Sequence, residues 1–316
     1  MPAAAIELKG LRKVYRTSRN GEKVAVGGMD LVVPRGSFFA LLGPNGAGKS
    51  TLINILAGLV NKTAGTARIF GVDIDEHPRR ARRAIGVVPQ ELNLDPFFTP
   101  RETLELQAGL YGVPRAERRT DALLQAVGLA DKADAYARSL SGGMRRRLLV
   151  AKALVHAPPV IVLDEPTAGV DVELRRSLWR YMQALNAAGV TIVLTTHYLE
   201  EAEELCDRIA IIDRGRLVAI DRKETLIRQL DQKNLYLTPA APLASLPPAL
   251  AGTDAELTAD GRLLVRYRPS RLQLGDVLDR IRAAGIVVAD LSTEEADLEE
   301  LFVRLTSEYR PAPDAH

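Results

Sequence analysis

Hydrophobic runs and hydrophobic repeats alternate along the middle of the chain. The segments FFALL (38–42), VIVLD (160–164) and TIVLTT (191–196) are short and dominated by apolar residues, without a polar residue at every second position. Such runs are typical of strands that are buried on both faces of a parallel sheet. Between them, apolar residues recur at helical spacing, as at Leu174 and Leu178. This alternation predicts an α/β fold in which helices cover a parallel sheet.

Two regions depart from that alternation. The pattern of residues 4–33 predicts β structure with a hairpin turn at an Asn-Gly dipeptide, which is favoured in such turns. Residues 97–158 have helical spacing instead, with apolar positions that include Leu104, Leu106 and Leu110. We therefore expect a separate α-helical subdomain over about residues 97–158.

A proline-rich segment separates the main domain from a smaller C-terminal one. Residues 239–253 contain four prolines and little charge, a composition typical of a linker. Beyond them the pattern predicts strand, helix, strand and helix, with Ser292 and Glu295 as the capping box of the last helix. The predicted division is a main domain over 1–232, a Pro-rich linker region over 233–256, a small βαβα accessory domain over 257–308 and a flexible tail over 309–316.

The composition excludes several classes of protein. The 316 residues are 47% hydrophobic and 26% charged, which is typical of a globular chain. A net charge of +2 gives no electrostatic footprint for nucleic acid, so none is expected as a partner. The single cysteine, Cys206, permits no intrachain disulfide, which fits a reducing compartment. We find neither a signal peptide nor an apolar window long enough to cross a membrane, so any membrane-spanning part is expected on another chain.

The strongest chemical signal is the sequence GPNGAGKS. Its spacing, Gly-x4-Gly-Lys-Ser, follows an apolar strand and opens a helical pattern, which is the context of a phosphate-binding loop. Glycines let backbone N–H groups close around phosphate oxygens, and the helix N-terminus adds positive potential. The lysine supplies a point charge to the outer phosphates, and the serine hydroxyl can bind Mg²⁺. The predicted nucleotide-binding residues of this segment are Gly43, Pro44, Asn45, Gly46, Ala47, Gly48, Lys49, Ser50 and Thr51.

Two adjacent carboxylates end a buried strand in VIVLDEP. Asp164 is predicted to hold Mg²⁺, directly or through water. Glu165, one residue further on, could polarise the attacking water as a general base. Acidic residues often end strands, so this prediction depends on the phosphate loop elsewhere in the chain.

Two further polar residues end predicted strands. Gln90 follows AIGVVP, and His197 follows TIVLTT. Because α/β sheets bind ligands at the carboxyl ends of parallel strands, both are candidates for the site. Taken alone, a surface glutamine and a structural histidine are the default interpretations.

A second candidate anion site lies in LSGGMRRRL. Ser141, Gly142 and Gly143 precede a helical pattern, so their N–H groups and the positive helix end suit a phosphate oxygen. We interpret the run Arg145–Arg147 as helix surface, with the two following leucines turned inward. The chain thus contains two segments that could bind phosphate.

Taken in order, six motifs resemble the ATP-binding cassette of ABC transporters. The match covers roughly residues 5–230. Met144 departs from the glutamine that is more usual after Ser-Gly-Gly in that family. The motifs are GPNGAGKST, Gln90, LSGGM, VIVLDEP, AGVD at 168–171 and TTH at 195–197.

The resemblance implies roles that the chemistry alone leaves open. Gln90 would contact Mg²⁺ or water and sense a membrane partner, Asp171 would link two cassettes, and His197 would contact the γ-phosphate. Tyr15 matches the aromatic residue that stacks on adenine, with an ordinary strand tyrosine as the alternative. The implied catalytic residues are Glu165, His197, Gln90 and Asp171, and the implied Mg²⁺ ligands are Ser50, Gln90 and Asp164.

The resemblance also implies the architecture. The expected fold is α/β, with a RecA-like P-loop core, an antiparallel β subdomain, an α-helical subdomain that holds LSGGM, and a small α+β C-terminal domain. The stretch from LSGGM through RGRL is most similar to the ATPases of ABC-2 type exporters, including bacterial drug-resistance ATPases. Members of that group often have a small C-terminal domain.

The implied function is ATP binding and hydrolysis that energise a membrane exporter. Two copies would sandwich ATP between the phosphate loop of one and the LSGGM motif of the other, and a separate multi-spanning permease would form the membrane path. The chain would lie at the cytoplasmic face of the inner membrane, held there by the permease. An importer ATPase is the alternative, because it needs the same motor. A soluble ABC ATPase of translation or repair is disfavoured by the single cassette and the lack of heptad repeats.

Overall fold

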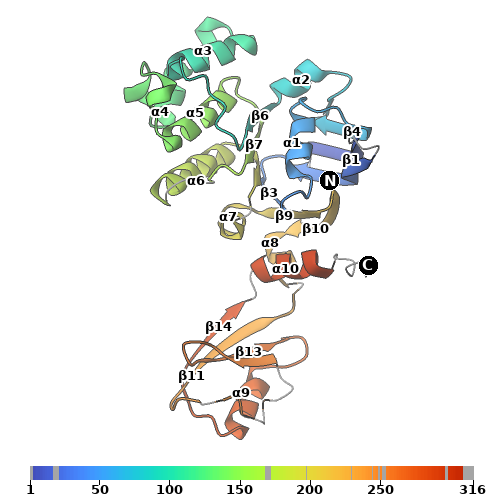
Figure 1. The fold of residues 1–316 in the computed structure, drawn as a ribbon, viewed down its shortest axis with the longest axis vertical. Coiled ribbons are helices and arrows are strands. Elements are labelled where there is room, and N and C mark those ends of the chain that lie inside the picture. The colour runs from blue at the N-terminus through green and yellow to red at the C-terminus, as the bar shows by residue number, and fades with distance from the viewer. Residues whose placement is uncertain are drawn as a thin grey trace. The chain divides into compact units, whose positions relative to one another are not determined.

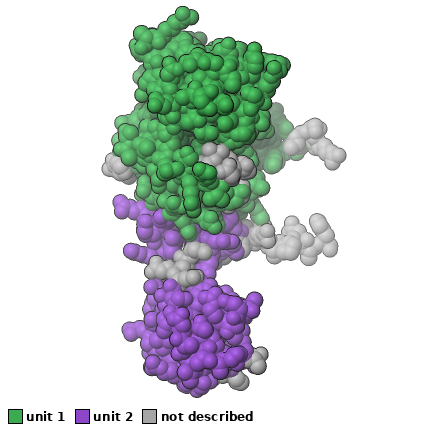
Figure 2. Space-filling view, turned by 90° about the vertical axis from the view of Figure 1, so that its left-hand side faces the viewer, with its two compact units in different colours: residues 1–221 green, residues 222–316 purple. Residues whose placement is uncertain are grey.

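The chain forms two compact units, residues 1–221 and residues 222–316 (Figure 1, Figure 2). The computed structural model describes residues 3–16, 21–167, 172–196, 198–228, 230–243, 245–247, 250, 254–295 and 298–308. Several predicted features lie outside the described residues: Asn20 of the hairpin turn, the AGVD segment with Asp171, His197 and the tail 309–316.

A six-stranded sheet organises the first unit (Figure 1). Its strands are β3 (Phe38–Leu42), β6 (Ile85–Val88), β7 (Val160–Asp164), β8 (Thr191–Thr195), β9 (Arg208–Asp213) and β10 (Arg216–Arg222). They lie in the order β10-β9-β3-β8-β7-β6, and the neighbours from β9 to β6 are parallel. Every residue of β3, β7 and β8 is buried, which is why these sequences contain unbroken apolar runs.

Helices pack on this sheet as the alternation predicted. They include α1 (Lys49–Leu56), α2 (Pro78–Arg83), α6 (Val172–Ala187) and α7 (Leu199–Leu205). Leu52 and Ile55 of α1 are buried in the same core as Phe39 and Leu41 of β3 and Val162 of β7. The predicted α/β architecture is confirmed, and the phosphate loop lies where β3 passes into α1.

An antiparallel sheet forms the N-terminal part of the first unit. Its strands are β1 (Ala4–Arg16), β2 (Glu22–Pro34), β4 (Ala64–Ile69) and β5 (Val72–Asp73), in the order β2-β1-β4-β5. Ile6, Leu8 and Ile69 from these strands are buried in the same core as the central sheet. This is the antiparallel β subdomain that the resemblance implies.

A group of helices forms the α-helical subdomain (Figure 1, green). It contains α3 (Pro100–Leu110), α4 (Thr120–Ala126) and α5 (Gly142–Leu154), with 3-10 turns at Arg115–Glu117, Ala130–Lys132 and Ala137–Ser139. Thr99 and Glu102 form a capping box at the start of α3. Of the three leucines in the predicted helical pattern, Leu104 is buried, but Leu106 and Leu110 are exposed. Positions 104 and 106 lie about 200° apart on a helix, so both cannot face the same core.

The second unit is built around a four-stranded antiparallel sheet of order β12-β13-β11-β14. Its elements are α8 (Lys223–Arg228), β11 (Lys233–Pro239), β12 (Asp254–Leu257), β13 (Leu263–Tyr267), α9 (Leu274–Ala283), β14 (Val288–Glu295) and α10 (Leu298–Glu308). Val277 and Ile281 of α9 are buried against Leu235 and Leu237 of β11. The expected small α+β domain is therefore present.

The prediction of a linker over residues 233–256 is wrong at both ends of that range. β11 begins at residue 233 and lies in the middle of the sheet, and β12 begins at residue 254 at its edge. Leu235 and Leu237 alternate with less buried residues, as in a strand with one face on a core. Both strands depend on pairing with β13 and β14, which follow later in the chain, and the local proline content does not report that pairing.

The capping box predicted at Ser292 and Glu295 is also wrong. β14 extends to Glu295, and Ser292 lies opposite Tyr236 of β11. Cross-strand pairing thus overrides the local capping pattern, and α10 begins at Leu298. Neither α10 nor any other helix in the described part of the chain is long and apolar enough to cross a membrane.

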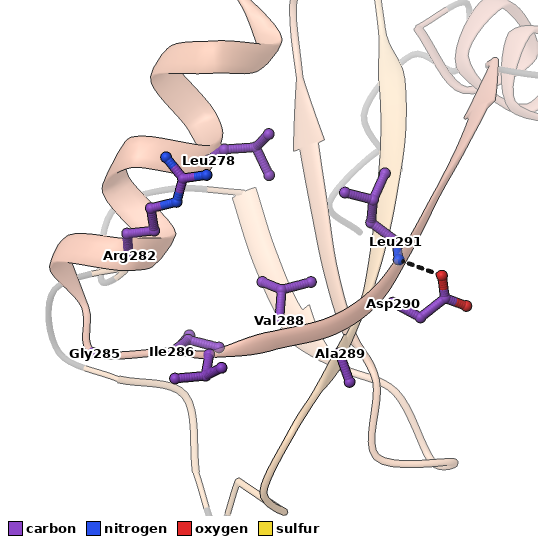
Figure 3. Close-up of a pocket in the computed structure, with 9 residues that line it drawn as sticks. Leu278, Arg282, Gly285, Ile286, Val288, Ala289, Asp290 and Leu291 are labelled. Atoms are coloured by element: carbon purple, nitrogen blue, oxygen red, sulfur yellow. Dashed lines mark hydrogen bonds between the residues drawn. The ribbon is translucent and has the colours of Figure 1, made fainter.

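A hollow of ≈ 660 Å³ lies between α9 and β14 of the second unit (Figure 3). It is lined by Leu278 and Arg282 of α9 and by residues 285–291. Val287 and Leu291 expose much of their side chains there. None of the residues predicted for nucleotide binding or hydrolysis lines this hollow.

Candidate nucleotide-binding and hydrolysis site

The loop between β3 and α1 is held from behind by the backbone of other strands. The amide of Gly215 donates to the carbonyl of Ala47, and the amide of Gly27 in β2 donates to the carbonyl of Gly215, each at 2.8 Å. Gly48 has a φ of 105°, in the region that favours glycine. A Cβ atom at Gly48 would lie 2.3 Å from the carbonyl oxygen of Ala25. The loop therefore has one conformation that the surrounding chain fixes and that requires glycine at this position.

Lys49 begins α1 and reaches back to the loop. It is only 6% exposed, and its Nζ donates to the carbonyl oxygens of Gly43 at 2.5 Å and Pro44 at 3.2 Å. Burial lowers the pKa of Lys49, and the charges of Glu165 and Asp164 act in the opposite direction. The hydrogen bonds that this ammonium group donates within the described residues go to neutral carbonyls, and it can exchange them for phosphate oxygens.

Asp164 and Glu165 are fixed at the end of β7 by a threonine of β8. Oγ1 of Thr195 donates to Oδ1 of Asp164 at 2.5 Å, and the amide of Glu165 donates to the carbonyl of Thr195 at 3.0 Å. Glu165 has a φ of 47°, a left-handed conformation that is uncommon outside glycine. Strained backbone of this kind clusters at functional sites, where it aims a side chain.

Gln90 meets the carboxylate of Glu165. Its Nε2 donates to Oε2 of Glu165 at 2.9 Å. Gln90 follows β6 and Glu165 follows the neighbouring β7, and the carboxyl ends of parallel strands lie at one edge of a sheet. Asp164 and Glu165 in turn lie near enough to Lys49 that their charges act to raise its pKa. The structure therefore brings together four residues that the sequence predicted from three separate motifs.

Donors suited to Mg²⁺ lie in this group. Ser50 follows Lys49 and is exposed, while Asp164 and Gln90 supply carboxylate and amide oxygens. The described residues contain no cluster of three or more His, Cys, Asp or Glu side chains that could hold a metal alone. Mg²⁺ is usually held by one or two protein carboxylates together with water and substrate phosphates. The donor set thus fits a Mg²⁺ ion that is bound together with ATP.

Tyr15 lies on the strand pair beside the phosphate loop. The residue is 37% exposed, and Nζ of Lys13 lies 4.7 Å from the ring centroid. Tyr15 is opposite Lys23 of β2, two residues before Ala25, whose carbonyl abuts Gly48. An exposed aromatic ring at this place could stack on adenine.

The LSGGM segment forms the open start of α5. Ser141 is the N-cap, and its Oγ accepts a hydrogen bond from the amide of Met144 at 3.2 Å. Ser141 and Gly142 are exposed, and a Cβ atom at Gly142 would meet nothing within 4 Å. Within the described ranges, no hydrogen bond or ion pair joins this segment to loop 43–48. The N–H groups at the helix start are therefore accessible to an anion from outside.

The interpretation of Arg145–Arg147 as helix surface is wrong. Arg146 is 4% exposed and donates to the carbonyl oxygens of Pro89 and Gln90 at 2.7 and 2.8 Å. Arg147 donates to two carbonyls just beyond the end of α4. The long arginine stems reach strand and helix ends that lie far away in the sequence. The two leucines that follow are buried, as predicted.

The hydrogen bonds of Thr195 and Arg146 were not predicted from the sequence, in which Thr195 stands within the TTH motif and Arg146 within the run interpreted as helix surface. A threonine inside an otherwise apolar buried strand was one available signal, because a buried hydroxyl needs a partner. The three consecutive arginines gave no such signal, because the arc of about 200° that they span can lie entirely on the solvent face of a helix. Asp171 and His197 lie outside the described residues, so their roles stay predictions.

A phosphate loop whose lysine lies beside an Asp-Glu pair at the carboxyl edge of a parallel sheet defines a P-loop nucleotide hydrolase. The family model for ABC transporters matches residues 26–168. The chain is 40% identical over 304 residues to Nod factor export ATP-binding protein I of Ralstonia nicotianae, a match that covers 95% of this chain and 93% of that protein. It is 38% identical over 320 residues to the daunorubicin/doxorubicin resistance ATP-binding protein of Streptomyces peucetius, covering 99% and 95%. The chain belongs to the ATP-binding subunits of ABC transporters.

Solved structures agree with this assignment. An ATP-binding subunit of an ABC transporter is 32% identical with a TM-score of 0.65, covering 72% of this chain and 93% of that one. A dimeric ATP-binding cassette in a post-hydrolysis state, bound to ADP and Pi, is 29% identical with a TM-score of 0.62, covering 69% and 98%. The predicted cassette fold is confirmed, and the reaction of this class of subunit is ATP hydrolysis.

Proposed function

We propose that this chain hydrolyses ATP to energise a membrane exporter of the ABC-2 type. The observation that carries the proposal is the convergence of Lys49, Asp164, Glu165 and Gln90 at one edge of the sheet, with the 2.9 Å contact between Gln90 and Glu165. The Ralstonia and Streptomyces relatives are named for export and for drug resistance. Both match nearly the whole chain, including the second unit, which favours an exporter over an importer.

Each side chain of the converged group has one task in the proposed reaction. Lys49 exchanges its loop carbonyls for oxygens of the outer phosphates. Glu165 takes a proton from the attacking water as the water oxygen bonds to the γ-phosphorus and ADP leaves. Gln90 holds the carboxylate of Glu165 in place through its amide. Ser50 and Asp164 would hold Mg²⁺, which would offset phosphate charge.

The remaining predicted residues complete the site around the nucleotide. Tyr15 stacks on adenine, and Gln90 would also contact Mg²⁺ or water. His197 contacts the γ-phosphate, and Asp171 joins the two cassettes. The loop residues from Asn45 to Thr51 surround the phosphates with backbone N–H groups, and Pro44, which has no N–H, lies at the start of the loop.

A second copy of the chain supplies the other half of each site. Ser141, Gly142 and Gly143 of one copy bind the γ-phosphate of ATP that is held by Lys49 of the other. The open helix start of α5 supports this arrangement, because Ser141 and Gly142 are exposed and no carboxylate among the described residues accepts a hydrogen bond from its N–H groups. The dimeric cassette that resembles this chain gives the precedent.

A separate multi-spanning permease is the proposed membrane partner, and it holds the chain at the cytoplasmic face of the inner membrane. Phe97 is 68% exposed and Tyr136 is exposed beside it, with the guanidinium of Arg138 5.8 and 5.2 Å from the two ring centroids. Aromatic residues are enriched at protein interfaces, so this exposed pair suits contact with another protein. The segment that holds Phe97 begins directly after Gln90, so contact there could reach the carboxylate of Glu165.

Co-purification tests this proposal. Expressed with its neighbouring open reading frames, the chain should retain a multi-spanning protein, and Phe97→Asp should release it. Val303→Asp, at an exposed apolar position of the second unit, is the matched control and should keep the complex. Direction is measured in inverted membrane vesicles with daunorubicin, the compound named for the Streptomyces relative. ATP-driven uptake supports export, whereas the absence of any membrane partner contradicts the proposal.

A further inference from the structure

Arg146 is a charged residue buried inside the first unit, five residues after the N-cap Ser141. Its two terminal nitrogens donate to the carbonyl oxygens of Pro89, at 2.7 Å, and Gln90, at 2.8 Å. One guanidinium therefore joins two successive carbonyls just after β6. This planar two-point contact fixes orientation as well as distance, and a lysine ammonium cannot reproduce it.

Arg146 is connected to Glu165 through Gln90. Arg146 holds the main chain of Gln90, and the side chain of Gln90 donates to the carboxylate of Glu165 at 2.9 Å. Arg146 and the LSGGM segment belong to one continuous helix of 13 residues and its N-cap. A displacement of LSGGM therefore moves Arg146 with it, and Arg146 moves the residue that touches Glu165.

Stability alone is a weak reason for a charge at this place. Burial lowers the pKa of Arg146, and the charge of Asp164 acts in the opposite direction, yet an arginine stays protonated in either case. Its Nε has no hydrogen-bond partner among the described residues. A well-packed apolar side chain is often as stable as a buried charge or more so. The two donated hydrogen bonds are therefore the property that only the arginine supplies.

Arg147 provides an internal comparison. It lies on the same helix and also donates to two carbonyl oxygens, those of Val127 at 2.8 Å and Gly128 at 3.0 Å. These carbonyls follow α4, so the contact stays inside the α-helical subdomain. Arg146 instead joins the subdomain to the edge of the central sheet where Glu165 lies.

We propose that Arg146 is a positioning residue that couples the LSGGM segment to Glu165 within one chain and thereby links the two ATP sites of the dimer. The inference rests on the proposed function, in which Ser141 of one chain meets the ATP of the other while Glu165 acts on the ATP of its own chain. Closure of α5 on one ATP then sets the carboxylate that acts on the second ATP. Hydrolysis at the two sites becomes cooperative through this contact.

Steady-state kinetics of the full chain test the coupling. Arg146→Met keeps the apolar stem and removes both donors, and we expect kcat to fall about 10- to 100-fold, as for a lost charged hydrogen bond. The Hill coefficient for ATP should fall to about 1, while the Kd for a non-hydrolysable ATP analogue stays within about twofold. Arg146→Lys should give an intermediate kcat, because one ammonium serves one carbonyl well.

Arg147→Met is the matched control, and it should keep the wild-type kcat and Hill coefficient even where both methionine variants lower the Tm. Equal losses in Arg146→Met and Arg147→Met would assign the effect to general loosening of the subdomain and overturn the coupling. An Arg146→Met variant with the wild-type kcat and Hill coefficient would overturn it as well. A wild-type chain that neither binds nor hydrolyses ATP contradicts the proposed function itself.

Heterodimers purified through two different tags assign the direction of the coupling. One subunit has Glu165→Gln, so a single site remains active, and its Glu165 belongs to the other subunit. Arg146→Met in the Glu165→Gln subunit should leave the remaining hydrolysis unchanged, whereas in the other subunit it should lower hydrolysis about 10- to 100-fold. The reverse pattern means that Arg146 only supports LSGGM for the ATP of its partner, and it overturns the link to Glu165.

Discussion

The phosphate loop and the LSGGM segment both suit a phosphate, but they are built to different degrees. The loop is packed against Ala25 of β2 and bonded to Gly215, and Lys49 closes it with a hydrogen bond to the carbonyl of Gly43. In the part of the chain that the structure describes, the LSGGM segment is supported from behind, through Arg146 and Arg147 further along α5. Its leading residues, Ser141 and Gly142, are exposed.

The difference shows which half can recognise a nucleotide alone. A buried ammonium with a preformed cradle can make charge-assisted hydrogen bonds worth about 1.5–3 kcal/mol each. A helix start without a cation offers its dipole, which contributes about 0.3–1 kcal/mol at an exposed surface. The loop can therefore bind ATP in a single copy, whereas LSGGM needs ATP that another copy already holds.

The largest expected effect separates the hydrolysis of ATP from the formation of the ATP-bound dimer. Glu165→Gln keeps the shape of the side chain and removes its capacity to accept a proton, so kcat should fall by about 10²- to 10⁴-fold while ATP still binds. ATP-bound dimers should accumulate, which light scattering after size-exclusion chromatography measures. Glu91→Gln, an exposed carboxylate one residue after Gln90, should hydrolyse normally. Wild-type turnover in Glu165→Gln would show that another group is the base.

A mutation in the LSGGM segment should leave the binding of ATP to the monomer intact. Ser141→Arg places a long side chain over the helix start, so ATPase activity should fall at least about 100-fold, as when oxyanion donors are lost. The Kd of the monomer for ATP, measured by calorimetry, should be unchanged. Ser292→Arg, the same substitution on the exposed surface of the second unit, should have no effect. A loss of monomer binding in Ser141→Arg would mean that both segments contact one ATP within a chain.

A mutation in the phosphate loop should weaken the binding of ATP itself. Lys49→Ala deletes the ammonium, and we expect the Kd for ATP to rise about 10- to 150-fold. Circular dichroism should show the wild-type fold, because the loop remains fixed by β2 and Gly215. Wild-type affinity would contradict the role of this loop.

Mixing the two damaged chains sharpens the comparison further. A heterodimer of Lys49→Ala and Ser141→Arg contains one site in which both mutations meet and one intact site. The mixture should therefore recover activity that neither variant has alone. Independent sites would give roughly a quarter of the wild-type rate, since about half of the random dimers are heterodimers with one intact site of two, and the coupling through Arg146 lowers the rate below that value. If both segments of a site came from the same chain, the mixture would stay inactive.

The smallest expected effect concerns the support at the far end of α5. His156 stacks on Tyr111 with ring centroids 3.7 Å apart, and its Nε2 lies 3.1 Å from the carbonyl oxygen of Ile85. Burial lowers the pKa of His156 from 6.5 to about 4. The unfolded chain therefore takes up this proton at a higher pH than the folded chain, and stability is lost as the pH falls from 6.5 towards 4.

We expect the Tm to fall by about 2–6 °C between pH 7 and pH 5 as a result of this histidine. His156→Phe keeps the stacked ring and should remove that part of the pH dependence in scanning calorimetry. The carboxylates with lowered pKa values, such as Glu105, lose their contribution at lower pH and do not obscure this window. An unchanged pH profile in His156→Phe would assign the acid sensitivity to other groups.

The parts of the fold that follow from local pattern could be predicted from the sequence. β3, β7 and β8 are buried on both faces, so their apolar runs identify them without any knowledge of neighbours. The phosphate loop was predicted because the glycine spacing reports a backbone conformation directly, as the φ of Gly48 illustrates. In both cases the physical cause acts over a few consecutive residues.

The features that were not predicted correctly depend on partners far away in the sequence. β11 is a strand because β13 and β14 flank it, although its sequence lies beside a proline-rich segment. Arg146 is buried because two carbonyls beyond β6 accept its hydrogen bonds, and nothing within its own helix indicates them. Glu165 was predicted as a base, but its left-handed backbone and the amide of Gln90 that meets it are tertiary features.

The hydrogen bonds from Lys49 to the carbonyls of Gly43 and Pro44 have a consequence for the working cycle. Nucleotide entry is an exchange, in which phosphate oxygens replace acceptors that the protein already offers. The measured affinity is then the difference between two sets of contacts, and it is smaller than the strength of either set. The same exchange favours the dissociation of ADP, because the carbonyls of Gly43 and Pro44 accept hydrogen bonds from the Lys49 ammonium again when ADP leaves. A subunit that must release ADP in every catalytic cycle benefits from this lower net affinity.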